Sequence, residues 1–406
     1  MLHGYAEPSA IVGAEVHFVS SAGAAMNVYL ILLIVLCNTT CMRASGILVS
    51  LFALDLGAEQ YVIGLLIALY ALFPALLAVY SGRLSDRIGP RTPMIAGSLG
   101  AVAGLLIPYV WQTMPALYAS AALFGISFIF YHVSVQNLLG AISSDANRTQ
   151  NFSNYSLMIA AGGFIGPLCA GLSIDQFGYR QTYLYLALTA VIPLVLLATS
   201  SALRTAVPRA KSPADAETGS RATRDLLRHR PLRSPLIGSV AVLTGTDLFQ
   251  FYMPIYGHSI GLSASQSGFV LSVVGIAAFV VRVAMPALVR RTGEAALLAY
   301  SLFLGAAAFV VFPLFKDVTV LTVFAFLLGL SLGCGQPLST ILIYANSPAG
   351  RTGEALGLRL ALNNATHVVI PLVAGSIGSV FGIGPVFWAN AMMLAGGGVA
   401  VRRASA

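Results

Sequence analysis

The chain alternates between long apolar runs and short polar links. Twelve of the runs are long enough to cross a lipid bilayer, because a spanning helix needs about 20 mostly apolar residues. The pattern therefore predicts an all-α membrane protein with twelve transmembrane helices. The expected spans are 27–54, 61–81, 92–110, 114–140, 153–173, 180–201, 236–256, 265–288, 295–314, 318–343, 354–378 and 383–401.

One polar segment is much longer than the other links. Residues 202–235 are rich in Ala, Pro, Ser and Arg, and they separate the first six apolar runs from the last six. A segment of this kind is typical of a flexible linker. We therefore expect an N-terminal cytoplasmic tail, a six-helix bundle, a cytoplasmic linker and a second six-helix bundle, at 1–26, 27–201, 202–235 and 236–406.

Composition and charge agree with this organisation. Charged residues make up only 9% of the 406 residues, whereas about 25% of an ordinary soluble chain is charged. The net charge is +8, and 17 of the 22 Lys and Arg lie in alternate links, in the linker or in the C-terminal tail. Because Lys and Arg are retained on the cytoplasmic side of membranes, we expect both termini in the cytoplasm and no nucleic-acid partner.

The two halves of the chain repeat each other with an offset of 204 residues. Ten positions carry the same residue type in this register, which is too long a match for chance. The first copies are Gly57, Gly64, Leu84, Arg87, Gly89, Gly125, Pro167, Gly171, Phe177 and Gly178, and the second copies are Gly261, Gly268, Leu288, Arg291, Gly293, Gly329, Pro371, Gly375, Phe381 and Gly382.

The polar link GRLSDRIGPR at 82–91 carries a family resemblance. It resembles the loop signature between the second and third transmembrane helices of the major facilitator superfamily, although Pro90 stands where that family usually has a base. The resemblance implies two six-helix halves around a pseudo-two-fold axis, with a substrate site between them. It also implies a gating motif at the cytoplasmic face, in which Arg359 is a candidate partner for Asp86. The motif residues are Gly82, Asp86, Arg87, Gly89, Arg91 and Arg359.

A second motif lies in the fifth apolar run. Gly162, Gly166, Pro167 and Gly171 resemble the glycine-proline motif of the superfamily's proton-coupled exporters. Many of those exporters also have an arginine in helix 4, where this chain has Ala121. The resemblance therefore implies export, with the proton relay moved to another place.

Two charged residues in the middle of apolar runs are the candidates for that relay. Arg43 and Asp247 are 204 positions apart, so they occupy equivalent places in helices 1 and 7, and we expect them to form an ion pair. Charges inside a membrane are costly and usually mark function. Asp247 is the only acid deep in any expected helix, which makes it the candidate proton site. The alternative is a permanent pair that only holds the halves together.

Other polar residues lie near this pair at helical spacing, and they predict a polar, net-positive cavity. For the residues of helix 11, the alternative is hydrogen bonding between helices without contact to substrate. For His132, the alternative is a core histidine whose hydrogen bonds are satisfied inside the protein. We expect Arg282 to be structural, and Cys37 and Cys41 to be packing thiols rather than metal ligands. The candidate cavity residues are Arg43, His132, Gln136, Asp247, Gln250, Gln336, Asn363 and His367.

These patterns predict a secondary active transporter of a bacterial cytoplasmic membrane, not an enzyme, with no cofactor and no metal site. Its expected partners are protons, the lipid bilayer and a small organic solute, and we expect a monomer to be functional. The preferred function is proton-coupled export. The alternative is uptake of an organic anion, such as a carboxylate, by proton symport. A membrane receptor, the other class considered, is expected to carry a soluble signalling domain.

Overall fold

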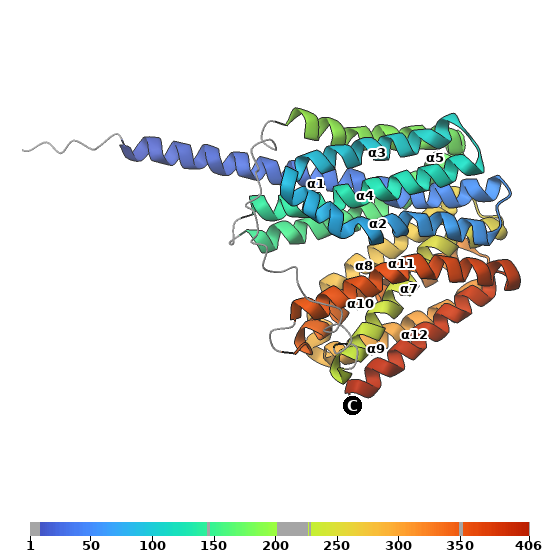
Figure 1. Cartoon of the computed structure of the whole chain (residues 1–406). Coiled ribbons are helices and arrows are strands. Elements are labelled where there is room, and N and C mark those ends of the chain that lie inside the picture. Colours follow the sequence, from blue (N-terminus) through green and yellow to red (C-terminus); the bar gives the residue numbers. More distant parts are fainter. Residues whose placement is uncertain (1–8, 144–146, 201–225, 227–228, 349–351, 406) are drawn as a thin grey trace, which may run out of the picture.

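The structure is a computed structural model that describes residues 9–143, 147–200, 226, 229–348 and 352–405. Every element in this part of the chain is a helix (Figure 1). The long helices are α1 (Ser9–Asp55), α2 (Gln60–Ile88), α3 (Arg91–Val110), α4 (Met114–Ile142), α5 (Arg148–Thr199), α7 (Arg230–Ser259), α8 (Ala264–Thr292), α9 (Glu294–Val311), α10 (Val318–Ala345), α11 (Thr352–Phe381) and α12 (Ile383–Ser405). A short 3₁₀ turn, η2 (Phe312–Leu314), follows α9.

The predicted twelve-helix fold is confirmed. Eleven helices of the described chain are long and apolar enough to cross a membrane. One of them, α5, covers two of the predicted spans. Its two parts meet at Gly178, where the backbone leaves the helical conformation with φ 79°. The chain reverses there, since a left-handed backbone position is available to glycine at little cost.

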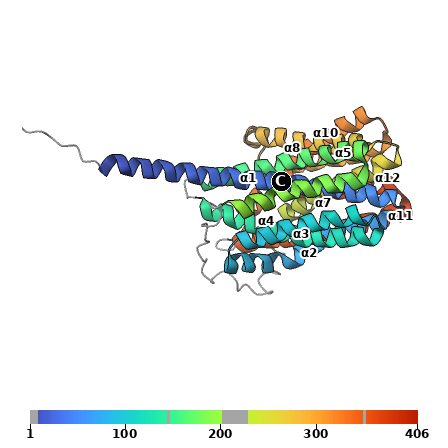
Figure 2. The ribbon, with the colours of Figure 1, turned by 90° about the horizontal axis from the view of Figure 1, so that it is seen from above.

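The helices form two bundles (Figures 1 and 2). In the first, α1 packs on α5 and α3 packs on α4; in the second, α8 packs on α10 and α9 packs on α12. Three helix pairs join the bundles: α2 with α11, α5 with α8, and α1 with α7. The protein is thus built from two halves that meet along a small set of helices.

The internal repeat is visible in the backbone. Six glycines of the described chain have positive φ, and no other residue type there does. They fall into three pairs with φ values that agree within 5°, and each pair is separated by 204 residues: Gly57 and Gly261, Gly89 and Gly293, and Gly178 and Gly382. Equivalent turns therefore occur at equivalent places, which confirms the predicted two-fold relation of the halves.

One predicted boundary is wrong. The link at 82–91 is mostly helical, because α2 continues to Ile88 and α3 begins at Arg91. Gly89 and Pro90 are the only helix breakers after Gly82 in this stretch, and the turn lies there. At the N-terminus, α1 begins at Ser9, and its part that can cross a membrane is Val28–Asp55, close to the predicted span 27–54. Most of the predicted linker 202–235 lies outside the described residues.

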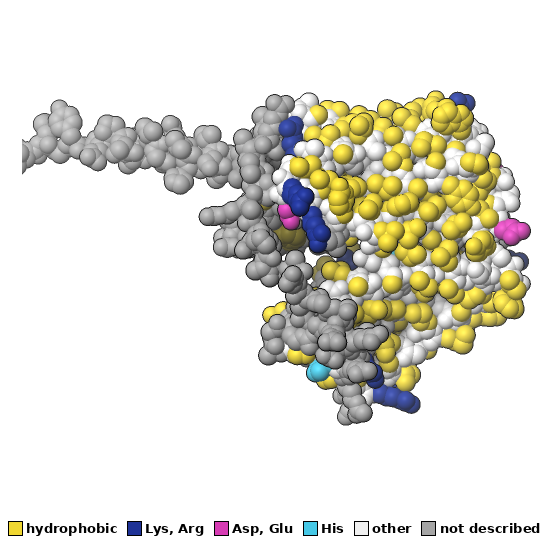
Figure 3. Space-filling model, in the orientation of Figure 1, with side chains coloured by type: hydrophobic (Ala, Val, Ile, Leu, Met, Phe, Trp, Pro, Cys, Tyr) yellow, Lys and Arg dark blue, Asp and Glu magenta, His cyan; other side chains and the backbone are white. Residues whose placement is uncertain are grey.

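The outer surface fits a lipid environment. Figure 3 shows hydrophobic side chains covering the flank of the molecule, with charged side chains near its ends. Large apolar residues such as Leu76, Val283 and Val380 are 68%, 68% and 73% exposed. We call the end with the turns at Gly89 and Gly293 the arginine-rich end, and the end with the other four positive-φ glycines the opposite end.

Candidate functional site

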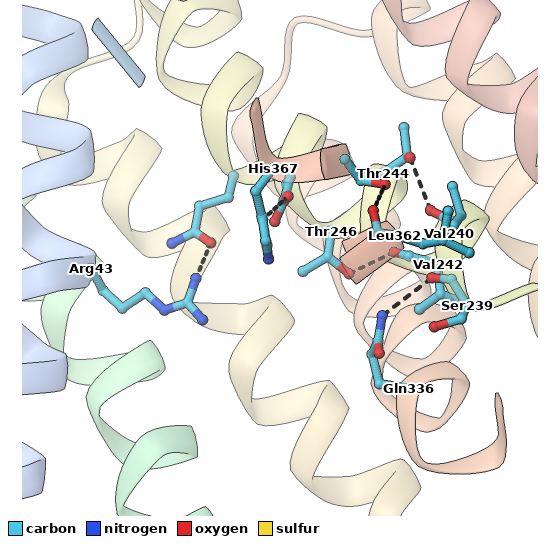
Figure 4. Close-up of polar contacts among 12 residues, drawn as sticks. Arg43, Ser239, Val240, Val242, Thr244, Thr246, Gln336, Leu362 and His367 are labelled. Atoms are coloured by element: carbon cyan, nitrogen blue, oxygen red, sulfur yellow. Dashed lines mark hydrogen bonds and ion pairs between the residues drawn. The ribbon is translucent and has the colours of Figure 1, made fainter. Parts of the chain in front are cut away.

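The central polar contact joins α7 and α11. His367 Nδ1 lies 2.5 Å from Asp247 Oδ2, and the two side chains are 40% and 19% exposed. Figure 4 shows His367 extending from α11 beside this contact. Both helices belong to the second half of the chain. The lone deep acid is therefore paired within its own bundle, while it keeps access to water.

Arg43 has a different partner from the one predicted. Its guanidinium donates a hydrogen bond to the side-chain oxygen of Gln250 on α7, and Figure 4 shows Arg43 reaching across from α1. Among the described residues, Arg43 and Asp247 form no ion pair, so that prediction is wrong. The reason is the direction of each side chain: Gln250 faces α1, whereas Asp247, one turn earlier, faces α11. Arg43 nevertheless links the two halves.

In the first half, His132 and Gln136 of α4 lie together, as their spacing predicted. Gln136 Nε2 is 2.9 Å from His132 Nε2, and the hydroxyl of Tyr155 on α5 is 3.4 Å from His132 Nδ1. Phe128 stacks on the imidazole ring at 5.0 Å. His132 therefore links α4 to α5, and partners at both ring nitrogens agree with a satisfied core histidine, the alternative that the sequence left open.

A matching cluster lies in the second half. Arg359 of α11 donates to Gln336 of α10 at 2.5 Å and to the hydroxyl of Ser239 on α7 at 3.0 Å. Ser239 also lies 3.4 Å from Asn363, and Figure 4 shows Gln336 directed at the backbone of Ser239. Tyr155 and Arg359 are 204 positions apart, as are His132 and Gln336. The repeat could therefore have identified Tyr155, which the sequence analysis missed.

The predicted gating contacts are formed within the first half. Asp86 is exposed and accepts a hydrogen bond from Asn137 of α4 at 3.2 Å. Arg91 donates to the carbonyls of Leu197 and Ala198 at 2.7–3.0 Å, and so caps the last turn of α5. Arg359 is held by Gln336 and Ser239 in this conformation, so its pairing with Asp86 stays a prediction.

The glycine-proline motif of α5 faces two helices. A Cβ atom at Gly162 would lie 2.8 Å from Thr39 of α1, and one at Gly166 would lie 2.8 Å from the Cβ of Arg43. The other face meets α8, where a Cβ at Gly268 would lie 2.4 Å from the carbonyl oxygen of Pro167. The motif thus brings the backbone of α5 against both α1 and the second half of the chain.

The same contact recurs in the second half of the repeat. A Cβ at Gly64 of α2 would lie 2.5 Å from the carbonyl oxygen of Pro371 and 3.3 Å from Gly375 of α11. Gly64, Pro371 and Gly375 correspond to Gly268, Pro167 and Gly171 by the 204-residue offset. Two equivalent glycine contacts therefore hold the halves together, toward the opposite end.

Two further groups outside this cluster have structural contacts. Arg282 of α8 donates to the carbonyl of Gly333 at 3.0 Å. That carbonyl has no partner in its own helix, because Pro337, four residues later in α10, has no N–H group.

The four cysteines are free thiols, and the described residues contain no group of His, Cys, Asp and Glu able to hold a metal ion.

Polar and charged residues between two six-helix halves are the arrangement of a secondary transporter. The sequence comparison agrees: the family model described as Major Facilitator Superfamily matches residues 31–320. The chain belongs to the major facilitator superfamily. Its fold and its family are those of transporters.

Individual relatives are distant but cover most of the chain. It is 22% identical over 325 residues to the uncharacterised MFS-type transporter YuxJ of Bacillus subtilis, covering 79% of this chain and 82% of the relative. It is 23% identical over 337 residues to the multidrug resistance protein MdtG of Klebsiella pneumoniae, covering 81% and 80%. The crystal structure of the nucleoside transporter NupG superposes with a TM-score of 0.76 at 14% identity, covering 93% of this chain and 99% of that one.

Proposed function

We propose that this transporter is a proton-coupled exporter of a small organic solute, acting by alternating access in the cytoplasmic membrane of a bacterium. The observation that carries the proposal is the polar cluster formed by Arg43, Gln250, Asp247 and His367, which lies where α1 of one half meets α7 of the other. The name of the MdtG relatives, multidrug resistance protein, supports export as the direction.

The Asp247 and His367 pair has the chemistry of a proton carrier. With both ring nitrogens of the imidazole protonated, the pair is a cation beside a carboxylate and is held by charge attraction. Loss of one proton removes the imidazolium charge and lowers the net charge of the pair by one. Because histidine changes charge near physiological pH, the pair can alternate between these two states during transport. Asp247 thus keeps the proton-coupling role expected from the sequence, with His367 as its partner.

Arg43 supplies the connection from this pair to the other half. Its hydrogen bond to Gln250 crosses between α1 and α7, and Gln250 lies one turn from Asp247. A change of charge in the pair of Asp247 and His367 acts on the nearby guanidinium through the electrostatic field. Proton exchange is thereby coupled to the strength of a contact between the halves, which alternating access requires.

The orientation follows from the distribution of arginines. We infer that the arginine-rich end faces the cytoplasm, since Lys and Arg are retained there. The glycine contacts lie toward the opposite end, which then faces outward. The described conformation is in this case closed to the outside, with the polar cluster reached from the cytoplasm.

Uptake of an organic anion by proton symport is the second candidate. Arg43 favours it, because a guanidinium binds carboxylates through two parallel hydrogen bonds and its present partner, Gln250, is a neutral amide that an anion can displace. In this version His367 adds a second donor beside the bound anion.

A gradient experiment in proteoliposomes separates the two functions. The purified protein is reconstituted, and a panel that includes ethidium and a short-chain monocarboxylate is offered with either the lumen or the outside made acidic. Proton-coupled export predicts accumulation of a panel member when the lumen is acidic. Accumulation only when the outside is acidic establishes symport instead, and equal distribution under both gradients contradicts proton coupling.

A further inference from the structure

A carboxylate from the first half lies at the beginning of α8 in the second half. Asp175 Oδ1 accepts a hydrogen bond from the backbone N–H of Ala264 at 3.0 Å, and Oδ2 accepts one from Ser265 at 2.8 Å. Asp175 belongs to α5, near its reversal at Gly178. The contact therefore crosses between the halves at the opposite end, beside the glycine contact of Gly171 with α8.

Two other backbone N–H groups at the beginning of α8 have hydrogen-bond partners within the same turn. Ser263 accepts from the backbone of Gln266 at 3.2 Å, and the side chain of Gln266 accepts from the backbone of Ser263 at 2.9 Å. This reciprocal pair is a capping box, and it leaves the N–H groups of Ala264 and Ser265 without a partner in their own half. Asp175 can accept hydrogen bonds from these two N–H groups only while the halves are in contact at this end.

The repeat contains an uncharged version of the same contact. Ser379 of α11 accepts a hydrogen bond from the backbone N–H of Tyr61, in the first turn of α2, at 2.9 Å. Ser379 corresponds to Asp175 and Tyr61 corresponds to Ser265 by the 204-residue offset. At this end, α2 is thus capped by a serine hydroxyl that accepts from one N–H group. The equivalent helix α8 is capped by a carboxylate that accepts from two.

We propose that Asp175 is the residue that stabilises the state closed at the opposite end, by capping α8 across the two halves. A negative charge at a helix N-terminus is attracted by the positive end of the helix dipole, and its hydrogen bonds are charge-assisted. Opening this end breaks both hydrogen bonds and removes the attraction. The inference concerns the balance between two conformations, so it stands apart from the proposed substrate and direction of transport.

The test measures that balance directly, without substrate. Nitroxide labels are placed at Gln112 and His258, one in each half at the opposite end and both exposed, in a background with the four native cysteines replaced. Double electron–electron resonance then gives the ratio of long to short distances. Because a helix cap of this kind changes an equilibrium by about three- to tenfold, Asp175→Ala is expected to raise the ratio by about fivefold. Asp175→Asn, which keeps one amide oxygen as an acceptor, is expected to give an intermediate ratio.

A second cap at the same end provides the matched control. Asp317 accepts hydrogen bonds from the backbones of Thr319 and Val320 at 2.9 and 3.1 Å, and these belong to its own helix, α10. Asp317→Ala removes a comparable cap without touching a contact between the halves, so the distance ratio should stay at the wild-type value. An unchanged ratio in Asp175→Ala, or an equal change in Asp317→Ala, would overturn the proposal.

A gain of charge tests the same idea even if Asp175→Ala does not fold. Ser379→Asp places a carboxylate opposite the backbone of Tyr61, at the equivalent position of the repeat. The ratio of long to short distances is then expected to fall by several-fold, because both sides of the closed end carry a charged cap. A ratio that rises or stays the same in this variant contradicts the proposal.

Discussion

At the scale of single residues, the proposed mechanism depends on the carboxylate of Asp247 and its contact with His367. Asp247 could be predicted because it is the only acid deep in an apolar run, and burial of a charge is costly. Its contact with His367 depends on how α7 and α11 are rotated against each other. A single sequence does not contain that rotation, so the equal spacing of Arg43 and Asp247 led to the wrong pair.

The first prediction concerns Asp247 itself. Asp247→Asn should abolish transport against a gradient, because a neutral amide no longer stabilises the protonated imidazole of His367, while counterflow of substrate down its own gradient should continue. Uptake into proteoliposomes with and without a pH gradient measures both quantities. Asp317→Asn is the control, since Asp317 lies outside both the polar cluster and the gating motif, and its amide oxygen can still accept from Thr319 and Val320. Gradient-driven transport that survives in Asp247→Asn would remove this residue from the coupling mechanism.

At the scale of helices, the positions of helices and turns could be predicted better than the faces through which the helices pack. The turn at Gly89 lies within the predicted link, but the polar residues before it belong to α2, which ends at Ile88. Polar residues at the end of a membrane helix remain helical where they reach water, and hydropathy does not register this. The packing of α5 on both α1 and α8 follows from the positions of its glycines, which the sequence indicated only as a motif.

The second prediction uses two glycines of α5. A Cβ at Gly171 would lie 2.3 Å from the carbonyl oxygen of Ala264, whereas one at Gly163 would have nothing within 4 Å. Gly171→Ala should therefore destabilise the protein by about 1–3 kcal/mol, the usual range for overpacking. Gly163→Ala should leave stability the same or slightly higher, since alanine favours helix. Thermal unfolding in detergent compares the two, and an equal effect would show that α5 and α8 are not in close contact.

At the scale of the whole molecule, the sequence predicted the architecture well. The 204-residue repeat anticipated the three pairs of positive-φ glycines and the two glycine contacts between the halves. The apolar runs anticipated the number of crossings, because lipid requires every spanning backbone to be helical or part of a closed barrel. The sequence did not indicate which end of the molecule is closed, since both closed and open states use the same residues.

The third prediction concerns orientation. A cysteine introduced at Ser212, in the predicted cytoplasmic linker and outside the described residues, should react with a membrane-impermeant maleimide only after the cells are opened. One introduced at Gln112, at the opposite end, should react in intact cells. The reversed pattern would show that the arginine-rich end faces outward.

The central claim is that the protein exchanges substrate for protons that move in the opposite direction. Proteoliposomes are loaded with the substrate found in the gradient screen and with a pH-sensitive dye, and are then diluted so that the substrate leaves. Antiport carries protons inward and symport carries them outward, whichever way the protein is inserted. The account predicts that the lumen becomes acidic with the wild-type protein and stays unchanged with Asp247→Asn. A lumen that becomes alkaline, or keeps its pH while the substrate leaves the wild-type vesicles, would contradict it.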